Sequence, residues 1–352
     1  MATTLESTSS TRPDTNRAWR YGALGPLLSG ARNTQLLYIA AKLGLADLLA
    51  DSPQSSADVA RTIGVHPQAL HRVMRGLVTI GILAEGEDGR FSLAPLGTQL
   101  RQGDPDSLHG WAIVWGELHY GSWGDLLHTV RTGEPAFDHA FGVTYWDYLA
   151  QHPELGDHFK RAMSHGTQRV AAAVLEAYDF CRARTIVDVG GGHGAMIAAI
   201  LKAVPAATGV LYDSASGLAG SQEQLQAAGV AERCELVAGD FFQEVPSGGD
   251  VYILAHTLHD WDDERSRAIL QQCRRAMREW SKLLVIERLL PERAEQAPHD
   301  IYLDLQMLVT VCGRERTKAE YQLLLSSAGF APVGIISTPC EVSILEAAPT
   351  PA

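Results

Sequence analysis

The sequence has few cysteines, no long apolar run and a deficit of basic residues. Its five cysteines are scattered and form no C-x-x-C pair, which argues against a zinc site and against a disulfide framework. No apolar run approaches the roughly 18 residues that a membrane-spanning helix needs. We therefore expect a cytoplasmic protein without a membrane partner, whose cysteines are small core residues in a reducing compartment.

The balance of charge is acidic. Asp and Glu number 41 against 29 Lys and Arg, which gives a formal net charge of −12. This charge repels polyanions, so nucleic acid is not expected as a partner. The apolar fraction of 46% is that of a globular protein, and 352 residues suffice for two domains. Residues 1–16 are rich in Ser and Thr, lack the apolar core of a signal peptide, and are expected to form a disordered tail.

Residues 17–105 are expected to form a winged-helix domain. The pattern predicts an amphipathic helix over 31–50, a Ser-capped helix that ends at Gly64, a helix over 69–80, and strands over 82–85 and 90–93. Such a unit commonly binds DNA. Within residues 55–97 four arginines are matched by four acids, so there is no basic footprint, and a packing or dimerisation role is favoured.

The segment 106–180 is expected to be a helical linker that is unusually aromatic. Most of its rings are expected to fill core space, because aromatic side chains dominate interior contacts. A site for a planar aromatic ligand would draw on such side chains, and Trp115 and Phe159 are our candidates for lining it.

Strand-like apolar runs alternate with helical segments through residues 181–350. This order predicts an α/β fold, a Rossmann-like doubly wound parallel sheet. The five runs expected to be parallel strands are 185–190, 208–213, 234–239, 250–256 and 282–287. The last two runs, 331–337 and 342–347, are joined by a short link and predict a hairpin with an antiparallel C-terminal strand.

The motif VDVGGGHGAM follows the first of these strands and opens a helix. Gly190, Gly192 and Gly194 stand where the backbone approaches a ligand, although such a loop alone is weak evidence. The motif is not a P-loop, because it lacks the Lys-Ser/Thr pair. With Ala195 it satisfies G-x-G-x-x-A, and Asp213 lies 23 residues beyond Gly190, as in a dinucleotide site.

Neighbouring acids distinguish the remaining ligands. Asp188 precedes the loop and Asp240 follows the third strand, so both carboxylates lie at the carboxyl ends of strands around one crevice. Such acids repel a pyrophosphate but suit S-adenosylmethionine, which carries an ammonium and a sulfonium. The methionine-derived cofactor is therefore favoured over a nicotinamide. A helix N-cap is the alternative role for Asp240.

The stretch LAHTLHDWDDERSRAIL, residues 254–270, places His259 and Asp260 just beyond the fourth strand. A phenol with a pKa of about 10 stays protonated at neutral pH, whereas an imidazole near 6.5 can accept its proton. Glu287 and Glu315 are placed to orient that imidazole. A metal held by His256, His259 and the nearby acids is the less favoured alternative, because Asp262 and Asp263 fit the first turn of a helix. We expect no metal.

Taken together, VDVGGGHG, GDFF, LHDWDDE, IERLLPE and DLQMLVTVCGRERTKAEY, in this order behind a winged-helix segment, resemble the metal-independent, S-adenosylmethionine-dependent O-methyltransferases. The chain looks most similar to bacterial members that modify aromatic natural products. The resemblance implies a homodimer formed through the N-terminal domain, and His259 as base with Glu287, Glu315 and Asp260 around it.

The resemblance also implies binding roles for individual residues. The Gly190 to Gly194 loop would hold the amino-acid end of the cofactor, Asp213 and Ser214 the ribose, and Asp240 and Phe241 the adenine. Ser164 would lie near the cofactor. Met163 and Met307 would sandwich the acceptor ring.

Three departures from the family limit what is carried over. DSAS at 213–216 replaces the frequent DLP, Ala255 replaces a common lysine, and His256 stands in place of an adenine-stacking tryptophan, where its ring can stack instead. Some bacterial relatives keep the fold and cofactor but catalyse hydroxylation, decarboxylation or pericyclic reactions. The presence of His259, Glu287 and Glu315 favours methyl transfer to a hydroxyl, with methylation of an aromatic carbon as a variant. A nicotinamide oxidoreductase and a winged-helix regulator remain alternatives of other classes.

Overall fold

A computed structural model of the protein describes residues 24–104 and 107–351. The tail expected over residues 1–16 lies outside the described residues. The chain divides between Thr98 and Gln99 into two compact units, each of which is described by itself.

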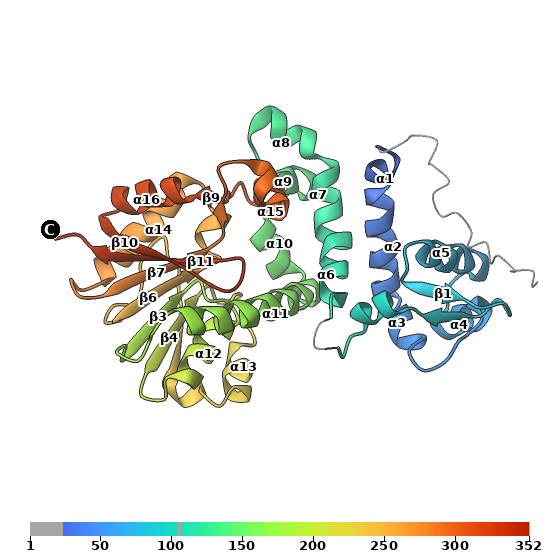
Figure 1. The fold of residues 1–352 in the computed structure, drawn as a ribbon, viewed down its shortest axis with the longest axis horizontal. Helices are drawn as coiled ribbons and strands as arrows, with labels where there is room; N and C mark the ends of the chain where they lie inside the picture. Colours follow the sequence, from blue (N-terminus) through green and yellow to red (C-terminus); the bar gives the residue numbers. More distant parts are fainter. Residues whose placement is uncertain (1–23, 105–106, 352) are drawn as a thin grey trace, which may run out of the picture. The chain divides into compact units, whose positions relative to one another are not determined.

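The first unit has the expected order of helices followed by a hairpin (Figure 1). Its elements are α1 (Leu24–Leu28), α2 (Gly30–Lys42), α3 (Leu45–Leu48), α4 (Ser56–Ile63), α5 (Pro67–Thr79), β1 (Leu83–Glu85) and β2 (Phe91–Leu93). The single helix expected over 31–50 is wrong, because Gly44 adopts a φ of +62° and separates α2 from α3. The expected serine cap is confirmed, since Ser55 Oγ accepts a hydrogen bond from the backbone N–H of Asp58.

The middle of the chain is helical, as expected. Its helices are α6 (His109–Val114), α7 (Tyr120–Gly124), α8 (Leu126–Thr132), α9 (Ala136–Phe141), α10 (Tyr145–Gln151) and the long α11 (Pro153–Ala177). A π-helical turn over Trp115–His119 joins α6 to α7. Rings from α9, α10 and α11 pack on one another at Phe137, Tyr145 and Phe159, as expected of side chains that fill core space.

The rest of the second unit is built on a seven-stranded sheet in the order β10-β11-β7-β6-β3-β4-β5. The strands are β3 (Thr185–Val189), β4 (Thr208–Asp213), β5 (Cys234–Ala238), β6 (Val251–Ala255), β7 (Lys282–Glu287), β10 (Phe330–Ser337) and β11 (Ser343–Pro349). β3 to β7 pair in parallel, and the C-terminal strand β11 is antiparallel to both of its neighbours. The doubly wound sheet with an antiparallel C-terminal strand is therefore confirmed.

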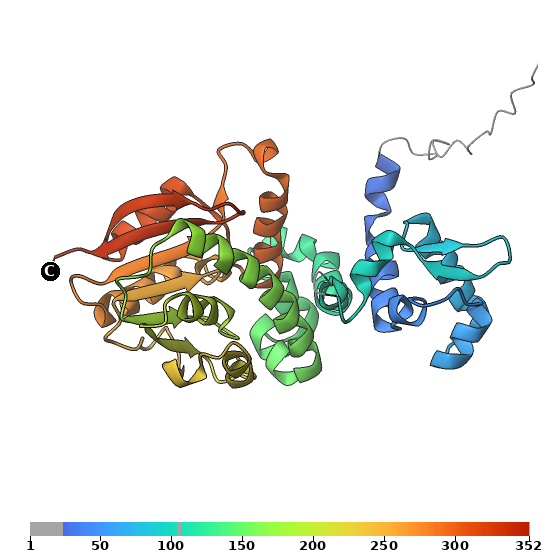
Figure 2. The same cartoon turned by 60° about the horizontal axis from the view of Figure 1, so that its bottom comes forward.

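Helices cover both faces of this sheet (Figures 1 and 2). One buried cluster joins α11 and α12 (Ala195–Ala203) to the sheet, with α13 (Ser221–Ala227) beside α12. The other joins α14 (Asp263–Ala276) and α16 (Lys318–Ser327) to the opposite face. The central strands β3, β6 and β7 are apolar on both sides because each face is buried there, which is typical of parallel sheets.

Two short elements were not predicted. β8 (Leu289–Leu290) and β9 (Arg316–Thr317) pair in parallel and fasten the segment after β7 to the segment after α15 (Pro298–Thr310). Each has only two residues, which is too short for an alternating apolar pattern. Among the described helices, none is both long and apolar enough to cross a membrane.

Candidate active site

The candidate residues gather at one edge of the sheet. Asp188 lies near the end of β3, Asp213 ends β4, and Glu287 ends β7. These strands run in the same direction, so their carboxyl ends meet along one edge, where ligands bind in open α/β sheets. At the same edge, the loop after β3 carries the glycine motif, the loop after β5 carries Asp240, and the turn after β6 carries His259.

The glycine loop is shaped by close contacts. The N–H of Gly190 donates to the carbonyl of Tyr212, at 2.8 Å, and the N–H of Gly192 donates to Oδ2 of Asp213, at 2.9 Å. Both glycines have positive φ, +72° and +54°. A Cβ on Gly191 would lie 2.6 Å from Oδ2 of Asp188, so this position accepts only glycine. The sequence analysis did not single out Gly191, although the run of three glycines was the available signal.

Asp188 is a buried carboxylate without a counter-charge. It is fully inaccessible, and among residues 24–104 and 107–351 neither of its oxygens has a hydrogen-bond partner. Burial, followed by the charge of Asp213, raises its pKa to about 7. A buried acid in this state is stabilised by a cation brought close to it.

Asp213 is engaged by the loop and by its own neighbours. Oδ2 accepts from Gly192, and Oδ1 accepts from the backbone N–H of Ser214 at 2.6 Å and from Ser214 Oγ at 3.1 Å. Burial raises its pKa, and these backbone hydrogen bonds oppose that shift. Gly217 is also required here, because a Cβ would lie 2.1 Å from Oδ1 of Asp213.

Asp240 is exposed and caps a turn. Its Oδ1 accepts from the backbone N–H of Phe242 at 2.9 Å, and no helix follows it, so the helix N-cap alternative is wrong. The ring of Phe241 lies beside the glycine loop, 3.5 Å from where a Cβ on Gly190 would be. It also packs edge-on against Trp261, with the ring centroids 6.0 Å apart. Phe241 therefore links the glycine loop to the HDW segment.

His259 lies in a 3-10 turn over Leu258–Asp260 and is almost completely buried. Nδ1 is 2.8 Å from Oε1 of Glu315 and 3.8 Å from Oε2 of Glu287, and Nε2 is 3.6 Å from Oδ1 of Asp260. Burial alone would lower the pKa of His259, but the charges of these three acids outweigh it and raise the pKa to about 10. The structure thus brings together all four residues predicted to be catalytic.

Glu287 fixes the turn that carries His259. Its Oε1 accepts from the backbone N–H groups of Thr257, at 3.0 Å, and Leu258, at 2.9 Å. Its Oε2 has no hydrogen-bond partner, and burial raises the pKa of the carboxyl to about 7. Glu315 likewise presents Oε1 to His259, while its backbone N–H donates to Oδ1 of Asp304.

Two residues that hold this turn were not predicted from the sequence. Arg316 is fully buried and donates to the carbonyls of Leu258, at 3.0 Å, and Trp261, at 2.8 Å. Residue 313 must be a glycine, because a Cβ there would lie 2.1 Å from the carbonyl oxygen of His259. Both belong to the GRERT element, in which only Glu315 was predicted to be a site residue.

His256 is held in an unusual backbone conformation, with a φ of +50°. Burial, followed by the charges of His259 and Arg288, lowers its pKa to about 3, so its ring is neutral. The ring lies 5.4 Å from that of His259 and tilted by 42°. The described residues able to hold a metal here are His256, His259 and Glu287. Asp262 instead caps the N-terminus of α14, and Asp263 lies in the first turn of that helix, as expected. Asp263 also accepts a hydrogen bond from Arg316.

The predicted acceptor-lining residues come from α11, α15 and the π-helical turn. Met163 and Met307 are half-buried on α11 and α15. Phe159 packs against Tyr145 and Trp146, while Trp115 is partly exposed and packs against His119 and Trp123. The backbone of Ser164 is part of α11, but its side chain lies outside the described residues.

Two family models match the chain. An O-methyltransferase dimerisation domain matches residues 26–102, and an O-methyltransferase domain matches residues 123–331. Phenazine O-methyltransferase PhzM of Lysobacter antibioticus is 46% identical over 323 residues, which are 92% of this chain and 94% of the relative.

Two further relatives bear on the ligands. 8-Amino-8-demethylriboflavin N,N-dimethyltransferase of Streptomyces davaonensis is 39% identical over 305 residues, 85% of this chain and 87% of the relative. The O-methyltransferase NcsB1 from neocarzinostatin biosynthesis, solved with S-adenosylmethionine and 2-hydroxy-5-methyl naphthoic acid, is 31% identical with a TM-score of 0.83. That match covers 93% of this chain and 98% of NcsB1.

Proposed function

The chain belongs to the O-methyltransferase family, whose models match both its N-terminal and its C-terminal part, and it is an enzyme that uses S-adenosylmethionine. On this premise we propose that it methylates a hydroxyl of an aromatic small molecule, a natural-product intermediate, with His259 as the general base. The observation that carries this proposal is the buried imidazole of His259, just beyond β6, among three acids: the adjacent Asp260, Glu287 at the end of β7, and Glu315 directly before β9.

The charge of the strand ends supports binding of the cationic cofactor. Asp188 offers two oxygens without hydrogen bonds, and Asp213 and Asp240 add negative charge at the same edge. We assign the amino-acid end to the loop at Gly190 and Gly192. The remaining cofactor contacts in this proposal are Asp213 and Ser214 at the ribose, Asp240, Phe241 and His256 at the adenine, and Ser164 nearby.

In the proposed mechanism, the cofactor supplies an electrophilic methyl group to the acceptor oxygen. His259 takes the phenol proton at Nε2, while Nδ1 is held by Glu315. The pKa of about 10 means that the imidazole is protonated in the protein without ligands at neutral pH. The positive charge of the cofactor opposes that of the imidazolium, so its binding favours the neutral form that accepts a proton.

Positioning contributes more than proton removal in this proposal. Holding two reacting groups in the right geometry is worth about 7 to 11 kcal/mol, whereas a general base gives about 10²- to 10⁴-fold, or about 3 to 5 kcal/mol. We assign the positioning of the acceptor ring to Met163, Met307, Phe159 and Trp115. The two methionines suit this role because their flexible thioethers adapt to an aromatic face.

The acceptor atom has competing candidates. The similarity to an N,N-dimethyltransferase makes an aromatic amine the second candidate acceptor. Methylation of an aromatic carbon, or non-methylating chemistry of the hydroxylase, decarboxylase or pericyclase type, would use the same fold. His259 favours a hydroxyl, because a phenol must lose a proton whereas a neutral amine can attack before it does.

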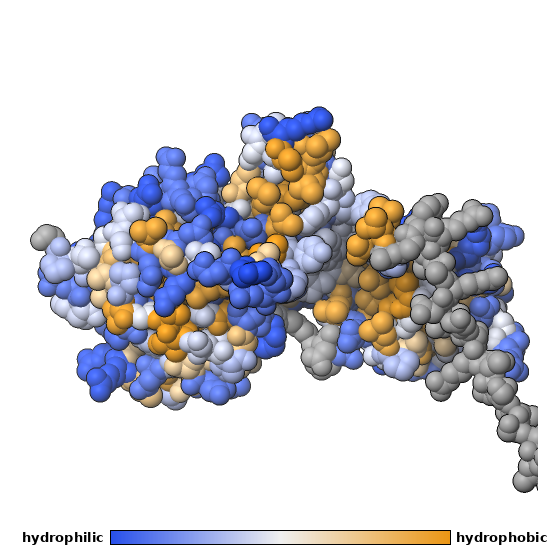
Figure 3. Space-filling view, turned by 45° about the horizontal axis from the view of Figure 1, so that its top comes forward, coloured by the Kyte–Doolittle hydropathy of each residue, from blue (hydrophilic) through white to orange (hydrophobic). Residues whose placement is uncertain are grey.

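A homodimer is part of the proposal. Apolar side chains lie at the surface of the first unit at Leu24, Leu27 and Leu28, and on α8 at Leu127 and Val130 (Figure 3). Exposed apolar patches often mark protein interfaces, and the first of these patches lies in or next to the matched dimerisation domain. We assign dimerisation to residues 17–105, acceptor lining to 106–180 and cofactor binding to 181–350.

The proposal is tested by mass spectrometry of products formed from S-adenosylmethionine and matched acceptors. The panel contains a phenol, the corresponding aniline and the corresponding methyl ether, in which the hydroxyl is already blocked. Gain of one methyl group by the phenol alone, located on oxygen by the fragment masses of the product, supports transfer to oxygen. Methylation of the ether on a ring carbon, or of the aniline in preference to the phenol, would contradict it.

A further inference from the structure

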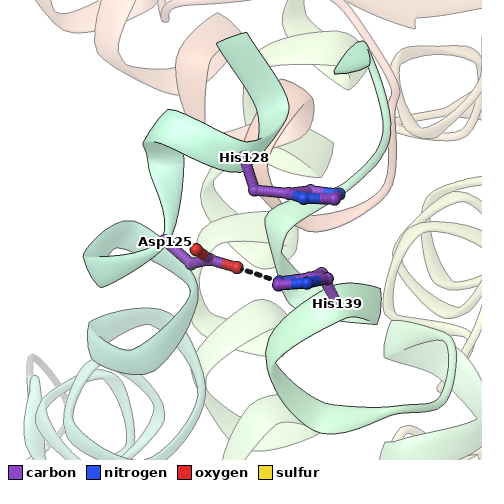
Figure 4. A group of neighbouring side chains, drawn as sticks. All are labelled: Asp125, His128 and His139. Carbon is purple, nitrogen blue, oxygen red and sulfur yellow. Dashed lines mark hydrogen bonds and ion pairs between the residues drawn. The ribbon is translucent and has the colours of Figure 1, made fainter. Parts of the chain in front are cut away.

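A second group of metal-ligating side chains lies outside the site described above. Asp125 precedes α8, His128 lies in the first turn of α8, and His139 lies on α9 (Figure 4). Each offers one ligand atom, and these three atoms all lie within 4.8 Å of one another. The group therefore draws donors from both sides of the turn between the two helices.

The contacts within this group are unusually close. Oδ2 of Asp125 is 2.5 Å from Nδ1 of His139. The rings of His128 and His139 are stacked, with centroids 3.9 Å apart and planes 9° apart, as Figure 4 shows. Two imidazoles and a carboxylate thus lie side by side at this turn.

His128 has an unused nitrogen that faces a carboxylate. Its Nε2 is enclosed and makes no hydrogen bond with any residue that the structure describes, and Oε2 of Glu134 is 3.5 Å away. Two ligands about 2.0 to 2.2 Å from one tetrahedral zinc ion stand about 3.3 to 3.6 Å apart. The 3.5 Å between His128 and Glu134 fits this range, so we take Glu134 as a fourth ligand beside the group of Asp125, His128 and His139. A hollow of about 400 Å³, lined in part by Glu134 and His139, opens at this place.

We propose that Asp125, His128, Glu134 and His139 bind a divalent transition-metal ion of the zinc class. Two imidazole nitrogens and two carboxylate oxygens are a donor set that suits zinc, cobalt or nickel, whereas magnesium and calcium prefer oxygen ligands alone. This assignment does not rest on the proposed function, because none of the four residues belongs to the candidate active site.

Metal binding requires one ring to turn. The lone pair of each nitrogen lies in the plane of its own ring, so two parallel rings cannot both direct a nitrogen at one ion. His139 is the ring that turns, since its side chain is 59% exposed and that of His128 only 18%. The ion then takes the place of the hydrogen bond between Asp125 and His139.

The ion would fasten a turn that contacts the catalytic segment. The thiol of Cys312 donates to the carbonyl of Gly133, in the turn between α8 and α9, at 3.0 Å. Cys312 directly precedes the GRERT element, which contains Glu315. A metal that joins α8 to α9 is therefore expected to stabilise the folded protein, because it binds only where both helices are in place.

The test is a zinc titration of the full chain by isothermal calorimetry, after treatment with a chelator. We expect the wild-type protein to bind one more zinc ion than the double variant His128→Gln/His139→Gln, and its Tm to rise on zinc addition by more than that of the variant. Any zinc bound at His256, His259 and Glu287 contributes equally to both proteins. Asp125→Asn, which preserves size, should weaken binding by at least the roughly 10- to 100-fold that loss of an outer-shell partner costs.

The matched control is His299→Gln, which removes an exposed histidine elsewhere in the same unit and should leave zinc binding unchanged. Circular dichroism and the Tm without metal establish that each variant is folded. If the double variant proves unfolded, Asp125→Asn and Glu134→Gln decide the matter through zinc affinity alone. Equal zinc stoichiometry and affinity in the wild-type protein and the folded variants would overturn the proposal.

Discussion

His259 and Glu315, which are 56 residues apart in the chain, place Nδ1 and Oε1 at 2.8 Å from each other in a buried site. Glu287 approaches the same nitrogen at 3.8 Å from the end of β7. The imidazole is thus held by acids from two other segments, which fix its orientation and raise its pKa to about 10. Four predictions follow from this arrangement and from the glycine loop.

Replacement of His259 by alanine should lower kcat by about 10²- to 10⁴-fold, because the variant lacks the proposed general base. Cofactor affinity should not fall, since the imidazole is proposed to act on the acceptor and loss of its positive charge removes a repulsion of the cationic cofactor. Stopped-time assays with the true acceptor and calorimetry with S-adenosylmethionine measure the two quantities. An unchanged kcat would remove His259 from the base role.

Replacement of Glu315 by glutamine should move the acidic limb of the kcat/KM profile to lower pH. The base is active when neutral, so a raised pKa means that the rate of the wild-type enzyme rises with pH above neutrality. Loss of one neighbouring charge and its hydrogen bond lowers that pKa, so the imidazole becomes neutral at a lower pH. Glu235→Gln, on the exposed surface of β5, is the control. A profile that does not move would contradict the electrostatic account.

Replacement of Asp213 by alanine should chiefly weaken cofactor binding. The carboxylate accepts from Gly192 and Ser214, so its loss removes both the proposed ribose contact and a support of the glycine loop. The KM for S-adenosylmethionine should rise, while kcat at saturation changes much less. Titration calorimetry that finds wild-type affinity would refute the assignment.

Replacement of Gly191 by alanine should reduce both stability and cofactor affinity. The added Cβ would lie 2.5 Å from Leu211 and 2.6 Å from Asp188, and overpacking of this kind costs about 1 to 3 kcal/mol. Gly166→Ala, where a Cβ meets nothing within 4 Å, is the matched control and should leave the cofactor affinity unchanged. Equal melting temperatures for Gly191→Ala and the wild-type protein would show that the loop accommodates a side chain.

Much of the fold could be predicted because its signals are local. The five parallel strands and the final hairpin were placed to within two residues, since runs buried on both faces are apolar along their whole length. The break between α2 and α3 at Gly44 could not be predicted, because one glycine inside an apolar periodic segment gives no sign that it adopts a left-handed conformation. The two-residue strands β8 and β9 carry no periodicity at all.

The residues of the candidate site were found by motif and by the rule that parallel strands end at one edge. Their electrostatic state could not be found in this way. The pKa of His259 depends on Glu287, Glu315 and Asp260 together, and that of His256 depends on burial. Arg316, Gly313 and the proposed metal site at Asp125, His128, Glu134 and His139 were not predicted from the sequence, because the partners of these residues are identified only by contact in space.

The sequence by itself determined the order of the elements, the doubly wound sheet, the acidic strand ends and the resemblance to a methyltransferase family, because each is encoded by neighbours along the chain. Tertiary structure alone decided which acids surround His259, why Asp188 is left without a hydrogen bond, and which histidines stack on α8 and α9. These properties depend on desolvation and on distances of a few ångströms between segments far apart in sequence, and no local pattern records either.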